Sequence, residues 1–305
     1  MTTKLDRFTQ WAQQEPQPRY NALMGMLTDP QGLRESFDKQ PGNKAAGADG
    51  VRKADYAANV NSKLELLSGK LRSLSWRPSP ARRVYIPKAN GKVRPLGIPS
   101  FEDRIVQDRL AGILQAIWEP QFRDCSYGFR PQRNAHQALK RLGEIITNER
   151  TQWLVEADIK GFFDNVSHEW LMKFLAHRIN DPVLLRVIRR LLKAGVLEDG
   201  QYQASEAGTP QGGLVSPVLA NIYLHYVLDV WFEKRFARHC RGRARLVRYA
   251  DDFVGCFTHE EDAQRFRQEL IHGLVLIFLT EPALRRAVLK SAMTSSMSMP
   301  CAASS

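Results

Sequence analysis

Three aspartates have residue types and a spacing that could do chemistry. Asp251 and Asp252 are adjacent within residues 248–253 (RYADDF), between two short apolar runs. This pattern predicts a tight β-hairpin with both carboxylates at its tip. Asp158 ends a second strand candidate, residues 153–158 (WLVEAD). Crowded like charges are costly unless a cation neutralises them. The three acids together form a set that can hold two Mg²⁺ ions for in-line attack on a nucleotide phosphate.

The elements expected around these acids are helices and short strands. Residues 1 to about 80 are mostly helical in pattern. Apolar and polar residues alternate along residues 82–99 on both sides of an Asn-Gly turn, which predicts a hairpin. Apolar residues recur at helical spacing before the Asp158 strand and, most clearly, from Pro217 onward. We therefore expect an α+β fold. An Asp-Asp pair by itself is a weak signal, because most such pairs are solvated loop acids.

The composition indicates a globular protein with a polyanionic partner. The chain has 305 residues, of which 43% are hydrophobic, and 44 Lys and Arg against 32 Asp and Glu give a net charge of +12. Part of the excess lies in residues 233–248, which hold seven basic residues and one acid. Nucleic acid is the partner that such charge favours, and a basic but unengaged surface is the alternative.

The cysteines and apolar runs indicate a cytoplasmic protein with no membrane association. The four cysteines are far apart and show no CxxC pair, which favours a reducing compartment and no structural metal. No signal peptide is visible, and the apolar run at residues 274–279 is far too short to span a bilayer.

Three segments with distinctive motifs are residues 153–166 (WLVEADIKGFFDNV), residues 208–224 (GTPQGGLVSPVLANIYL) and RYADDF. They resemble the palm motifs of one family, the reverse transcriptase/maturases encoded by bacterial group II introns. Segments that resemble its N-terminal extension, its fingers and their link to the palm are residues 43–51, 83–99, 104–107 and 126–139. The motifs follow the family order over roughly residues 20–276.

The resemblance implies the right-hand polymerase architecture with fingers and palm. We expect an N-terminal extension and fingers at 1–104, and a palm at 105–276 interleaved with a fingers segment at about 166–206. Residues 277–286 (IFLTEPALRR) lack the family's next block, and no later segment resembles a thumb, which indicates truncation or a frame change after about residue 276. The tail at 277–305 is expected to be aberrant and disordered, since its low-complexity end cannot pack a core.

The resemblance also assigns metal ligands. Asp158 and Asp251 would bridge two Mg²⁺ ions, with Mn²⁺ as a substitute, and the carbonyl of Ile159 would be a further ligand. Asp252 would lie nearer the primer-side metal. The alternative for Asp158 is a helix cap or a surface acid at a strand end.

Four further residues are expected to bind the nucleotide. Lys88 and Arg94 match basic fingers positions that would contact the triphosphate, although they could also be solvated charges on an exposed hairpin. Gln211 would contact the incoming nucleotide, and Phe163 would block a 2′-hydroxyl and so favour deoxynucleotides. The alternative for Phe163 is that it and Phe162 both belong to the core.

The expected function is RNA-directed DNA polymerisation in group II intron splicing and mobility. The chain would add dNTPs to the 3′-hydroxyl of a DNA primer on an intron RNA template. Two alternatives stay open: a non-catalytic RNA-binding remnant, and an inactive truncated product of a decayed mobile element. The oligomeric state is not indicated.

Overall fold

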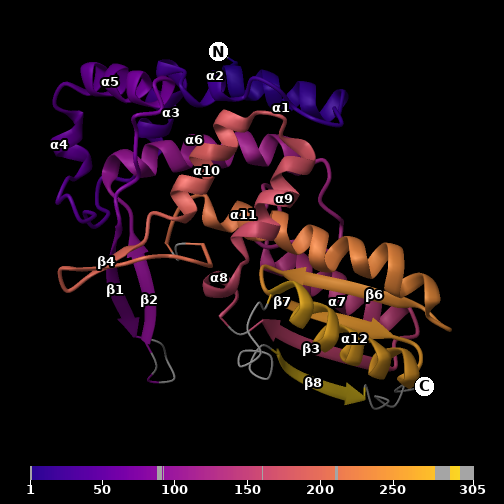
Figure 1. Cartoon of the computed structure of the whole chain (residues 1–305). Coiled ribbons are helices and arrows are strands. Elements are labelled where there is room, and N and C mark those ends of the chain that lie inside the picture. The colour runs from indigo at the N-terminus through magenta and orange to yellow at the C-terminus, as the bar shows by residue number, and fades with distance from the viewer. Residues whose placement is uncertain are drawn as a thin grey trace, which may run out of the picture. The chain divides into compact units, whose positions relative to one another are not determined.

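The computed structural model of the chain describes residues 2–87, 91, 93–159, 161–209, 212–278 and 289–295, with side-chain environments as far as Leu270. It is an α+β protein in which helices accompany two four-stranded sheets (Figure 1). The chain forms two compact units. Unit 1 comprises Met1–Gln121 and Phe163–Tyr223, and unit 2 comprises Phe122–Phe162 and Leu224–Ser305.

Unit 1 is mainly helical. Its helices are α1 (Lys4–Gln14), α2 (Met24–Leu27), α3 (Pro30–Lys39), α4 (Lys53–Ala57), α5 (Val60–Arg72), α6 (Phe101–Trp118), α9 (His168–Arg178) and α10 (Pro182–Leu192), while α8 (Phe162–Asn165) and α11 (Ser216–Leu224) lie at the unit boundaries. The helices expected within residues 1 to about 80 and from Pro217 onward are therefore present, as α1 to α5 and α11. Among the described helices, none is both long and apolar enough to cross a bilayer.

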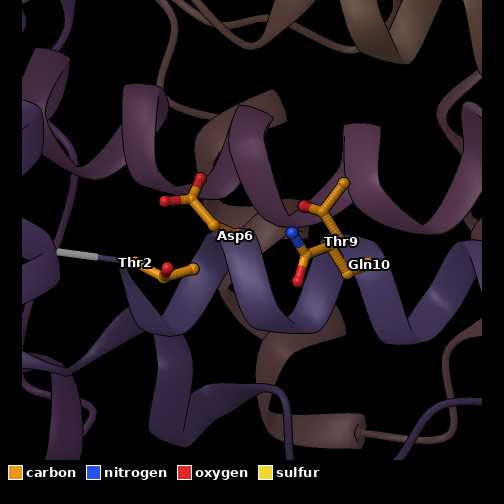
Figure 2. Close-up of a pocket in the computed structure, with 4 residues that line it drawn as sticks. All are labelled: Thr2, Asp6, Thr9 and Gln10. Atoms are coloured by element: carbon orange, nitrogen blue, oxygen red, sulfur yellow. The ribbon is translucent and has the colours of Figure 1, made fainter.

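Helix α1 begins with a reciprocal capping box. The Thr3 hydroxyl accepts from the Asp6 amide, and the Asp6 carboxylate accepts from the Thr3 amide. An open depression of about 520 Å³ runs along this helix, lined by Thr2, Asp6, Thr9 and Gln10 (Figure 2). Because the Asp6 carboxylate already accepts a hydrogen bond in the capping box, we do not assign the depression as a ligand site.

Helix α6 lies at the centre of unit 1 and carries a buried cation. The Arg109 guanidinium donates to the Met26 carbonyl at 3.1 Å and to Glu35 at 3.3 Å. Gly32 on α3 lies directly against it, because a Cβ at that position would overlap the guanidinium. The pairing with Glu35 balances the buried charge where α2 and α3 pack on α6.

The sheet of unit 1 has the order β2-β1-β4-β5. The hairpin expected at residues 82–99 is present as β1 (Ala81–Pro87) paired antiparallel with β2 (Val93–Ile98). The short hairpin β4 (Val196–Glu198) and β5 (Gln201–Gln203) extends it, with β4 parallel to β1.

The sheet of unit 2 has the order β6-β7-β3-β8, with every pair antiparallel. Its strands are β6 (Ala244–Tyr249), β7 (Asp252–Phe257), β3 (Trp153–Ile159) and β8 (Leu289–Ser295), and Figure 1 shows β3 between β7 and β8. The hairpin expected around RYADDF is present as β6–β7. Two π-helical segments that continue α11, η1 (His225–Asp229) and η2 (Phe232–Phe236), lead to it, followed by the short 3₁₀ helix η3 (Ala237–His239).

Each face of this sheet has its own cover, because side chains alternate along a strand. On one face, Phe257 of β7 packs against Phe266 of α12 (Glu260–Phe278) with ring centroids 5.2 Å apart, and Phe236 of η2 joins them. On the other face, α7 (Ala135–Asn148) contributes Ile145, which packs with Cys256. Asp252 lies on the same face as Cys256, four residues nearer the start of β7.

Strand β8 falls within the tail that the sequence predicts to be disordered. Its backbone pairs with β3, with Ser295 opposite Trp153 and Leu289 opposite Ile159. The structure differs from the expectation at these residues, because the free edge of β3 offers backbone hydrogen-bonding groups that a strand of any composition can use. Residues 279–288 and 296–305 lie outside the described part of the chain. The domain boundaries expected at 104 and 276 stay a prediction.

Candidate functional site

Asp158 and Asp252 face each other across neighbouring strands. They are register partners in the β3–β7 pair, next to the Ala157–Phe253 pair. Residues directly opposite in an antiparallel pair have Cβ atoms about 4.5 to 5.5 Å apart and point to the same face. Asp158 is half-buried and Asp252 is exposed, whereas Ala157 and Phe253 are buried on the other face. The two carboxylates are therefore held together by a rigid sheet and remain open to solvent.

The charges at this place favour a cation. Partial burial raises the pKa of the Asp252 carboxyl, and the neighbouring carboxylates of Asp158 and Glu156 raise it further. Glu156 is exposed two residues before Asp158, on the same face of β3. The repulsion among these acids at an open strand end is relieved when a cation binds between Asp158 and Asp252.

The hairpin that carries the acid pair has a constrained tip. A two-residue loop, Ala250-Asp251, joins β6 to β7, and Ala250 has φ +58°. Two-residue hairpin loops need positive φ because only then does the turn match the twist of the strands. Gly128 packs on the tip so closely that a Cβ there would overlap the Ala250 nitrogen. Asp251 is partly exposed within this loop.

Arg248 fixes the hairpin tip through hydrogen bonds on its buried side. Its side chain is fully buried and donates to both carboxylate oxygens of Asp229, at 2.7 and 2.6 Å. It also donates to the Ala250 carbonyl at 2.9 Å and to the Ser126 hydroxyl at 2.8 Å. A bidentate arginine–carboxylate pair fixes geometry as well as charge. Arg248 thus connects the tip that carries Asp251 to two other parts of unit 2.

Sequence reasoning missed this role. The sequence predicts residues 233–248 as one basic segment close to the acids; Arg248 does lie at the hairpin, but it is enclosed and paired with Asp229. Arg248 lies on the same face of β6 as the buried Ala244 and Leu246, and this period-two signal could have revealed it. Lys234, Arg235 and Arg238 are exposed, as contact with a nucleic acid would require.

The glycine-rich segment at residues 208–213 belongs to unit 1 and is anchored at both ends. Gly212, with φ +100°, lies against β2, where a Cβ would come within 2.5 Å of the Gly97 carbonyl oxygen. Just beyond it, the Leu214 amide donates to the Gln107 side chain of α6 at 2.9 Å. Gly208 packs on the 163–164 backbone.

The four residues expected to bind nucleotide are only partly described. Arg94 is an exposed residue of β2, opposite Ile86. Phe163 is half-buried, while its neighbour Phe162 is buried, so the pair is divided between a core residue and a partly exposed one. Lys88 and Gln211 lie outside the described residues.

The metal ligands expected from the sequence are brought together in part. Asp158 and Asp252 are paired and Asp251 adjoins them, while Ile159 ends β3 as a buried residue. Within the described residues, no cluster of three or more His, Cys, Asp and Glu side chains is close enough to hold a metal unaided. Mg²⁺ is commonly bound through one or two carboxylates together with substrate phosphates, and the pair fits that mode.

The comparisons with known proteins agree on one family. The family described as reverse transcriptase (RNA-dependent DNA polymerase) matches residues 86–279. The chain is 38% identical to protein YkfC of Escherichia coli strain K12 over 277 residues, which covers 80% of this chain and 72% of that protein. It is 39% identical over 222 residues to the group II intron-encoded protein LtrA of Lactococcus lactis subsp. cremoris, which covers 72% of this chain and 37% of LtrA.

A solved structure shows the same fold. The apo telomerase of Candida tropicalis, truncated from the C-terminal domain, matches with a TM-score of 0.53 at 14% sequence identity. The match covers 78% of this chain and 56% of that one. The α+β fold with polymerase fingers and palm is thereby confirmed.

Proposed function

Since the chain belongs to the reverse transcriptase family of RNA-directed DNA polymerases, we propose that it extends a DNA primer with dNTPs on an RNA template. We further propose that the template is a group II intron RNA and that the activity serves intron splicing and mobility. The similarity to LtrA, a group II intron-encoded protein, supports that assignment.

The observation that carries the proposal is the pairing of Asp158 with Asp252 across β3 and β7. We assign Asp158, Asp251 and Asp252 as metal ligands, with the Ile159 carbonyl as a further one. Two Mg²⁺ ions, or Mn²⁺ in their place, would neutralise the phosphates and activate the primer 3′-hydroxyl. The sheet supplies the fixed separation of the carboxylates, and Arg248 holds the hairpin tip in place.

In unit 1, the proposal assigns nucleotide binding to Lys88, Arg94, Gln211 and Phe163. The exposed Arg94 guanidinium is suited to bidentate contact with a phosphate. The Phe163 ring is suited to exclude a 2′-hydroxyl by its bulk, since it is half-buried and keeps part of its surface accessible.

The nucleic-acid partner is supported by the charge of unit 2. Lys234, Arg235 and Arg238 are exposed along η2 and η3. Cations in such a row neutralise phosphates and release counterions, which gives binding without sequence preference.

The decisive experiment is primer extension by the purified 305-residue chain on an RNA template with dNTPs and Mg²⁺. We expect the Asp158→Asn variant to lose extension, and the Glu156→Gln variant to retain it. Glu156 is the matched control because it is an exposed acid on the same face of β3.

Extension by the Asp158→Asn variant at the unmodified chain's rate would contradict the catalytic assignment. Salt-sensitive RNA binding without extension by the unmodified chain would instead favour the second candidate, a non-catalytic RNA-binding protein, which the exposed cations of η2 and η3 also support.

A further inference from the structure

His168, the first residue of α9, connects two segments of unit 1 that lie far apart in sequence. Its Nε2 atom lies 2.6 Å from the carbonyl oxygen of Gly208. Because a carbonyl can only accept, the imidazole donates from Nε2, and its proton is on that nitrogen. His168 therefore fixes the carbonyl at the start of the glycine-rich segment.

The same two segments are joined by two backbone hydrogen bonds. The Gly208 amide donates to the Val166 carbonyl at 2.8 Å, and the Thr209 amide donates to the Phe163 carbonyl at 2.7 Å. Gly208 has φ +86°, and a Cβ there would lie 2.7 Å from the Phe163 carbonyl oxygen. Glycine is thus required both by conformation and by space.

The imidazole is half-buried at this junction. Its Nδ1 atom is buried and has no hydrogen-bond partner among the described residues. Burial lowers the pKa of His168, and the charge of Lys193 lowers this pKa further. The hydrogen bond to Gly208 and the charge of Glu206 offset part of the decrease. The lowered pKa favours the neutral form of the ring, which acts as a single-donor link through Nε2.

We propose that His168 is a positioning residue that fastens the Gly208-Thr209 backbone to the 163–166 segment. The consequence for catalysis rests on the proposed function: the link fixes the backbone of Phe163, the residue assigned to exclude ribonucleotides. Thr209 reaches the Phe163 carbonyl directly, so displacement of the Gly208-Thr209 backbone shifts Phe163. A looser link should admit ribonucleotides more readily.

A pair of amide variants separates the donor from simple packing. In His168→Gln the amide nitrogen can occupy the place of Nε2 and donate to Gly208, whereas the shorter side chain in His168→Asn cannot reach it. We expect the peptide that contains residues 208 and 209 to exchange its amide hydrogens about fivefold to tenfold faster in the Asn variant. The Gln variant should exchange at close to the unmodified rate.

Gly208→Ala tests the same link from the other side. The added methyl group would displace Gly208 from the Phe163 carbonyl, so the same peptide should exchange faster while His168 is intact. Peptides from α5 serve as an internal control, and their exchange should not change in any variant. Equal exchange by the His168→Gln and His168→Asn variants would overturn the proposal.

Primer extension with matched deoxy- and ribonucleotides gives the second readout. We expect the ratio of kcat/KM for dCTP to that for CTP to fall about fivefold or more in His168→Asn and to be retained in His168→Gln. If the unmodified chain extends no primer but the exchange pattern is as expected, the proposed function fails and the link stands. If the unmodified chain prefers deoxynucleotides and both variants discriminate equally, the assigned consequence for selectivity is wrong and the proposed function stands.

Discussion

Arg248 and Asp229 form a fully buried, bidentate ion pair, with nitrogen–oxygen distances of 2.7 and 2.6 Å. Asp229 ends η1, and Arg248 lies one residue before the end of β6, so the pair joins the helix after α11 to the acid-bearing hairpin. Breaking such a pair leaves one charge buried without its partner. The site therefore depends on a salt bridge that is itself fully buried.

The first prediction concerns this pair. Asp229→Ala should lower the free energy of unfolding by about 3 to 5 kcal/mol, because Arg248 would keep its charge in an enclosed place. Urea unfolding followed by circular dichroism measures the change. Lys173→Ala, which removes an exposed pair with Glu169 on α9, is the control and should change little. A loss as small as that of the control would show that Arg248 is not held by Asp229.

Two glycine-to-alanine changes should have opposite effects. Gly128→Ala should destabilise unit 2 by about 1 to 3 kcal/mol, since its Cβ would overlap the Ala250 backbone at the hairpin tip. Gly143→Ala, at an exposed position of α7 with no atom within 4 Å of the new Cβ, should stabilise by about 0.5 to 1 kcal/mol. Thermal unfolding of the two variants tests the close approach, and a stabilising Gly128→Ala would contradict it.

Metal affinity should depend on Asp252, which is paired with Asp158, more than on Glu156. Asp252→Asn should weaken Mn²⁺ binding about tenfold or more, because it removes one of the three carboxylates that we assign as metal ligands. Glu156→Gln removes an equal charge from the same face and should have a smaller effect. Isothermal titration with Mn²⁺ compares the two variants. If the two variants bound Mn²⁺ with equal affinity, the weaker binding would come from the lost charge alone and not from a specific site.

The exposed cations of η2 and η3 should contribute to RNA binding through phosphate contacts. Replacing Arg235 or Arg238 with Gln should lower the slope of log K against log salt by about 1 for each residue. Arg245→Gln should change the slope less, because Arg245 pairs with Glu149 at 2.8 Å. Fluorescence anisotropy with a structured RNA at several salt concentrations measures the slopes. Affinity that does not change with salt would exclude phosphate-dominated binding.

Stability should respond to pH through a buried acid of α6. Burial raises the pKa of Asp103 from 3.8 to about 7. The folded protein thus binds more protons than the unfolded chain between these values, so this group's contribution to the free energy of unfolding falls as the pH rises from about 4 to about 7 and then levels off.

Asp103→Asn should remove that dependence while keeping an acceptor for the Ser79 amide, which donates to Asp103 at 2.9 Å. The variant's stability relative to the unmodified chain should therefore increase across this pH range, as chemical denaturation at pH 5, 6 and 7 would show. A difference that stays constant with pH would mean that Asp103 is charged in the fold.

The local chemistry of the site could be predicted from the sequence. Alternation around RYADDF predicted the β6–β7 hairpin, and the apolar run before Asp158 predicted β3, which the structure confirms. These predictions succeed because turn residues and strand periodicity act over a few neighbouring residues. The family could be predicted as well, because each of its motifs is a continuous stretch of sequence.

Only the tertiary structure decided which charges serve the site and which hold it together. The sequence does not show that Asp158 is opposite Asp252, or that Arg248 reaches the Ser126 hydroxyl 122 positions away. It left open whether Phe162 or Phe163 is buried, and the structure buries Phe162. Strand register and burial depend on how distant segments pack, and a basic residue in a basic run has the same local sequence whether it is solvated or enclosed.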